Sequence, residues 1–115
     1  MLQRKKVRRP VDHLQGTGHV YIEDARIADV EYDLDVVQEF VSVKNVSPPQ
    51  ELKGVKTVSG KLVTVGNGVI PMLRTVLVLE LQDQRKLDFY VSRSIPHAYA
   101  YQYEIKGSGG LRETM

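Results

Sequence analysis

Apolar and acidic residues alternate without interruption from Ala28 to Val36. Every second position is apolar, and the positions between them are all acidic: Asp29, Glu31, Asp33 and Asp35. Because successive side chains of a strand point to opposite faces, this pattern predicts one β-strand with an apolar face and an acidic face. Such a strand is typical of an antiparallel sheet that has one face on the core and the other in water.

The rest of the chain also shows strand patterns, separated by glycine, proline and polar turn signals. We expect the long strand to run from about Ile27 to Lys44, with a bulge near residues 37–39, where the alternation slips by one position. Residues 75–81 are apolar on both parities except Glu80, which predicts a central strand buried on both faces. The remaining predicted strands are 19–23, 54–65, 86–92 and 98–105.

No segment shows a convincing amphipathic helix, so the sequence predicts an all-β fold. A single core then favours a small antiparallel barrel or a strongly curled sheet of six to seven strands, without a substantial helix. We favour the barrel because a long bent strand serves two sheets at once. At 115 residues the chain is long enough for one core and too short for two.

The charge distribution predicts three regions. Residues 1–10 carry five Lys and Arg and no acid, whereas the rest carries 11 Lys and Arg against 14 Asp and Glu. We therefore expect a disordered basic N-terminal arm over residues 1–15, one β-barrel domain over 16–106 and a flexible, glycine-rich tail over 107–115. The absence of cysteine excludes disulfides and thiolate sites, and no apolar run is long enough for a membrane span. We expect a cytoplasmic, bacterial or phage protein that does not act at a membrane.

The acidic face of residues 29–35 has three interpretations. A solvated face is the simplest, and contact with a basic partner or with the chain's own arm is the second. A metal is the third, but alternate residues of a strand lie about 6.5–7 Å apart, too far for neighbours to share one calcium ion easily. His13, His19 and His97 show no metal-ligand spacing, so we expect no metal and no cofactor. Motifs for catalysis are also missing, and an enzyme would need these acids to meet His19 or His97 in space.

The basic arm and a row of tyrosines are the candidates for ligand binding. Tyr99, Tyr101 and Tyr103 share one parity of the last predicted strand, where they either pack in the core, which we favour, or stack on bases. The arm supplies electrostatic attraction for nucleic acid or another polyanion. The candidate residues for such binding are Arg4, Lys5, Lys6, Arg8, Arg9, Tyr99 and Tyr101.

Two short motifs resemble those of PilZ domains. Arg4 and Arg8 have the spacing of an R-x-x-x-R motif, and residues 45–50 (NVSPPQ) resemble a D/N-x-S-x-x-G motif, with Gln50 in place of the glycine. PilZ domains are small β-barrels that bind cyclic di-GMP. The resemblance implies a cyclic-dinucleotide-binding barrel as one alternative function.

The sequence favours a non-enzymatic binding module over an enzyme. The first hypothesis is a self-associating assembly or adaptor protein, a homo-oligomer, because residues 69–73 and 76–81 hold more apolar side chains than a small barrel covers. The alternative is a polyanion-binding module that uses the basic arm.

Overall fold

The structure, a computed structural model, describes residues 3–44, 50–66, 68–71, 76–97 and 100–113, and contains no helix among them. It is built from six strands: β1 (Gln3–Ile22), β2 (Ala25–Lys44), β3 (Gln50–Val65), β4 (Leu77–Glu80), β5 (Lys86–His97) and β6 (Ala100–Gly107). All pair antiparallel in a closed barrel of order β1-β2-β3-β6-β5-β4. The predicted small antiparallel barrel is confirmed.

The barrel interior is filled by the apolar parity of each strand. Leu34 of β2, Leu62 of β3, Leu77 of β4 and Phe89 of β5 are fully enclosed, and Ile105 of β6 joins them. The alternation from Ala28 to Val36 places its apolar residues in this core and its acids on the outer wall. Burial of these side chains is the main force that holds the barrel closed.

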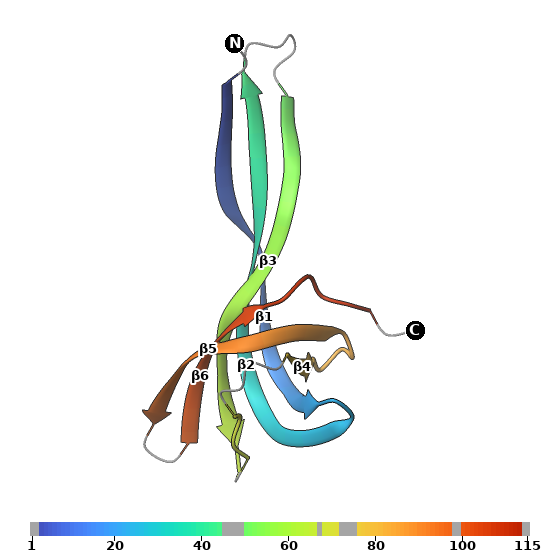
Figure 1. The fold of residues 1–115 in the computed structure, drawn as a ribbon, viewed down its shortest axis with the longest axis vertical. Coiled ribbons are helices and arrows are strands. Elements are labelled where there is room, and N and C mark those ends of the chain that lie inside the picture. The colour runs from blue at the N-terminus through green and yellow to red at the C-terminus, as the bar shows by residue number, and fades with distance from the viewer. Residues whose placement is uncertain (1–2, 45–49, 67, 72–75, 98–99, 114–115) are drawn as a thin grey trace.

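Three strands continue beyond the barrel as a second, narrower sheet. Residues 3–10 of β1 pair with residues 37–44 of β2, which pair in turn with residues 50–57 of β3. We call these three segments the extension. It projects from one end of the barrel and makes the molecule elongated, with principal extents of 58 × 34 × 25 Å (Figure 1).

Two bulges lie where the barrel gives way to the extension. The β1–β2 register shifts between Pro10 and Asp12, and the β2–β3 register shifts between Gln38 and Phe40. The second shift confirms the bulge predicted near residues 37–39. Because a bulge bends its strand and increases the local twist, these two positions let the strands leave the barrel wall as a separate sheet.

Residues 3–15, for which the sequence predicts a disordered arm, belong to β1 in the structure. Strand pairing accounts for the difference, because residues 3–10 pair with residues 37–44 of β2 along their whole length. The C-terminal tail, for which the sequence predicts flexibility, is also held by backbone pairing. The backbone groups of Arg112 exchange two hydrogen bonds with those of Lys86, 2.7 and 2.8 Å long, which bring this end of the chain back to β5.

The prediction that residues 75–81 are buried on both faces is wrong for the described residues 76–81. Leu77, Leu79 and Leu81 are buried, Val78 and Glu80 are half-buried, and Val76 is 47% exposed. The physical reason is that β4 forms part of a barrel wall, in which one face of every strand points outward.

Candidate functional site

The acidic row on β2 lies on the outer wall of the barrel. Glu31, Asp33 and Asp35 are exposed and Asp29 is half-buried. The register places the outward side chains of β1 directly beside them. His13 is opposite Asp35, Gln15 opposite Asp33, Thr17 opposite Glu31 and His19 opposite Asp29, so that each acid has a polar neighbour across the strand pair.

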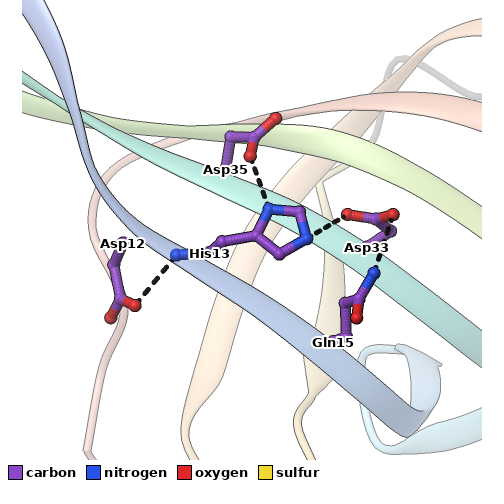
Figure 2. Close-up of polar contacts among 5 residues, drawn as sticks. All are labelled: Asp12, His13, Gln15, Asp33 and Asp35. Atoms are coloured by element: carbon purple, nitrogen blue, oxygen red, sulfur yellow. Dashed lines mark hydrogen bonds and ion pairs between the residues drawn. The ribbon is translucent and has the colours of Figure 1, made fainter.

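His13 is held between two of these carboxylates. Its Nδ1 lies 2.7 Å from Oδ1 of Asp35, and its Nε2 lies 3.0 Å from Oδ1 of Asp33 (Figure 2). Ionised carboxylates only accept hydrogen bonds, so both ring nitrogens donate when both contacts form, and the ring is then an imidazolium. The hydrogen bond to Asp35, followed by the charge of Asp33, raises the pKa of His13 above its usual 6.5. The Gln15 amide completes the cluster by donating to Asp33 over 3.2 Å.

Asp29 contacts two basic side chains, those of His19 and Arg26. Nδ1 of His19 lies 2.9 Å from its Oδ1, and Nε of Arg26 donates to the same oxygen over 2.8 Å. The hydrogen bond with His19, and after it the bonds from Arg26, lower the pKa of Asp29. Within the described part of the chain, the hydrogen-bond and ion-pair partners of the acidic row therefore come from the barrel itself.

Two of the sequence hypotheses for the acidic row concern the basic arm and a metal ion. The basic segment of β1 lies beside residues 37–44, beyond the acidic row, so the chain's own arm does not cover these acids in the structure. No group of three or more His, Asp or Glu side chains among the described residues has an arrangement that could hold a metal ion. Of the two histidines proposed for an enzyme site, His19 contacts an acid of the row, Asp29. The side chain of His97 lies outside the part of the chain that the structure describes.

Sequence reasoning missed His13 as a partner of the acidic row, and it named His19 only as a member of a hypothetical enzyme site. Their signal was present, because His13, Gln15, Thr17 and His19 alternate with the same period of two as the acids. Reading it required the hairpin register, and the bulge at Val11 shifts that register by one residue.

The five cations of residues 4–9 lie along β1 in the extension, and the pairing divides them between two faces. Lys5 and Arg9 share the face of Gln38 and Phe40, which we call the inner face, while Lys6 and Arg8 lie on the opposite, outer face. Arg8 donates to the hydroxyl of Thr57 over 3.2 Å. Arg4 lies in the strand at a position of the outer face, opposite Val43.

A cavity of about 450 Å³ opens where the inner face meets the barrel. Three cations from one strand, β3, and the turn before β5 line it, although the sequence analysis singled out none of them: Lys53, Lys56 and Arg85. Its apolar lining comes from Val11, Val36, Phe40, Val58 and Leu111, and two acids, Asp12 and Glu113, complete it. The lining of the cavity is thus amphipathic, and we call its five apolar side chains the apolar floor.

The tyrosine row is divided between core and surface. Tyr103 is buried, and its hydroxyl accepts a hydrogen bond from the backbone N–H of Ile70 over 3.1 Å. Tyr101 is 45% exposed, with its ring centroid 6.2 Å from that of Tyr103, and Tyr99 lies outside the described residues. The β5–β6 hairpin that carries Tyr101 is at the opposite end of the molecule from the extension (Figure 1). The basic residues and Tyr101 therefore do not form one surface.

Comparison with known proteins found no match among protein-family models, curated proteins or solved structures. Of the two motifs that resemble PilZ domains, residues 45–49 lie outside the described part, and Arg8 is engaged with Thr57 on the extension. In the described residues there is no helix with the length and apolar character that a membrane span requires.

Proposed function

We propose that this protein is a non-enzymatic assembly module in which two copies join through the extension. The observation that carries the proposal is a sheet without a core of its own. Of the described side chains in residues 3–10, 37–44 and 50–57, only Gln38 is buried. Narrow sheets become independently stable when one face packs against something, so the extension is the part of this molecule that gains most from a partner.

The two outer edges of the extension have different capacities for pairing. On β1, Pro10 lacks an N–H group and five cations repel another positively charged strand, which are devices that protect an edge. On β3, the described pairing with β6 covers only residues 59–63, so residues 50–57 have no second neighbour among the described strands. Their three charges, on Glu51, Lys53 and Lys56, are of mixed sign. The β3 edge is therefore the one suited to backbone pairing with a second copy.

Exposed apolar side chains flank that edge. Leu52 is 53% exposed and Val55 is 65% exposed, and Leu52 is the register partner of Val41 on the outer face. Antiparallel pairing of two β3 edges about a two-fold axis joins both extensions into one six-stranded sheet and buries these residues. The apolar surplus expected at residues 69–73 and 76–81 is smaller than the sequence suggests, since Ile70, Leu77, Leu79 and Leu81 are in the core.

Light-scattering mass after size exclusion tests the proposal. We expect wild-type protein at about 100 µM, a concentration at which weak dimers form, to have twice the 13.0 kDa chain mass. The double variant Leu52→Lys/Val55→Lys should have the single-chain mass. Val69→Lys/Val76→Lys is the matched control, because these valines are 57% and 47% exposed and lie outside the extension. Circular dichroism checks that each variant is folded. A wild-type monomer, or a dimer that both variants leave intact, contradicts the proposal.

A further inference from the structure

We propose that the inner face of the extension, together with the cavity at its base, binds single-stranded nucleic acid. This inference is separate from self-association and uses a different face of the same sheet. The inner face combines cations from two strands. Lys5 and Arg9 come from β1, and Lys53 and Lys56 come from β3, on either side of the central strand β2.

The charge of this face is only partly balanced by the protein. Arg9 pairs with Glu51 at 3.2 Å, and Arg85 pairs with Asp83 at 2.8 Å. Lys5, Lys53 and Lys56 are exposed, and none of them has an ion pair within the described part of the chain. Three ammonium groups are therefore available to an anionic ligand, and they lie along a strip that reaches from the cavity toward the far end of the extension.

The apolar floor distinguishes between anions. Phe40 lies between the two basic strands, with the Arg9 guanidinium 4.9 Å from its ring centroid. Aromatic rings and guanidinium planes are the surfaces on which unpaired bases stack. A free phosphate does not use such a floor, and a duplex keeps its bases paired and stacked. A single strand offers both the phosphates for the lysines and a flat base for Phe40.

The size of the cavity and the length of the basic strip also suit a single strand. A cavity of about 450 Å³ is within the range of ordinary small-ligand sites and is large enough for a nucleobase. The cations continue beyond the cavity along β1, at Arg9 and Lys5, which favours a polymer over a single nucleotide. Binding by such a strip is driven by counterion release, so it depends steeply on salt and little on sequence.

Fluorescence anisotropy with a labelled oligothymidylate of about 20 nucleotides, longer than the site of a small barrel, tests the inference across a range of NaCl concentrations. The double variant Lys53→Gln/Lys56→Gln removes two phosphate contacts, which should reduce the slope of log affinity against log salt by about 1.4 and the affinity at 0.1 M NaCl by about 25-fold. The matched control is Lys61→Gln/Lys106→Gln, which removes the same charge from two exposed lysines of the barrel wall. Its slope should stay at the wild-type value.

A second variant separates base stacking from charge. Phe40→Leu should weaken binding of the oligothymidylate by fivefold or more, since base stacking on an aromatic ring contributes about 1–3 kcal/mol, and should leave binding of linear inorganic polyphosphate unchanged. Equal losses in the two lysine pairs would overturn the assignment of this face. Equal affinity for polyphosphate and oligothymidylate, with no effect of Phe40→Leu, would overturn nucleic acid as the ligand. Absence of oligothymidylate binding at low salt would overturn both.

Discussion

Gly60 is the residue at which one added methyl group should disturb the barrel most clearly. It lies in β3 between Leu34 of β2 and Ile105 of β6. A Cβ at this position would approach the carbonyl oxygen of Asp33 to 2.1 Å and the Cα of Leu34 to 2.8 Å. Both neighbours are backbone atoms, so no flexible side chain can move aside, and β2 must separate locally from β3.

The size of the effect follows from two opposing contributions. Overpacking of this kind costs about 1–3 kcal/mol, and one or two weakened ladder hydrogen bonds add about 1 kcal/mol. Alanine restricts the unfolded chain and returns about 0.4–1 kcal/mol. The clash is the larger contribution, so we expect Gly60→Ala to lower the free energy of unfolding by about 2 kcal/mol. For a chain of this length that corresponds to a fall in Tm of about 8 °C.

Thermal and urea unfolding followed by circular dichroism measure this change. Gly110→Ala is the control, because a Cβ at Gly110 would meet no atom within 4 Å. It should leave Tm within about 2 °C of wild type, in the range of surface substitutions. A Gly60→Ala protein that is as stable as wild type would refute the close approach of β2 and β3 at this point.

Two further predictions concern polar groups. The pKa of His13, measured by NMR titration of its ring protons, should lie above 6.5 and fall more in Asp35→Asn than in Asp33→Asn, because the hydrogen bond to Asp35 is its largest cause. Since folding raises this pKa, the stabilisation by His13 is fully present below the unfolded pKa and is lost as pH rises through the folded one. The Tm difference between wild type and His13→Gln should therefore be larger at pH 6 than at pH 9, and a constant difference would contradict the cluster. Tyr103→Phe leaves the buried N–H of Ile70 without its partner, so it should cost about 1–2 kcal/mol in urea unfolding, whereas an unchanged midpoint would contradict that bond.

The barrel could be predicted from the sequence because its core strands alternate strictly. From Ala28 to Val36 each apolar residue is enclosed, and the one interruption of the pattern became the bulge at Gln38 and Phe40. Both features are local in sequence, so periodicity alone reveals them.

The extension could not be predicted in the same way. Residues 3–10 contain few apolar side chains, and their strand conformation depends on partners that are up to 41 positions away, as in the pairing of Gln3 with Lys44. The basic cavity was missed for the same reason, since Lys53, Lys56 and Arg85 come together only when β3 and the turn before β5 meet in space. The contacts of His13 required the register of β1 on β2, which a single bulge determines.

The short contact between β1 and β4 that closes the barrel has a consequence for the order of folding. It comprises three register pairs, from His19 with Glu80 to Tyr21 with Val78, between segments about 60 positions apart. The β1–β2 hairpin needs only a turn at Glu23 and Asp24, so its loop-closure entropy is small and it should form early. We expect closure at β4 to come last, because it joins the most distant segments. This seam, where a methyl on Gly18 would collide with the carbonyl of Glu80, is where the native barrel should open first in transient local unfolding.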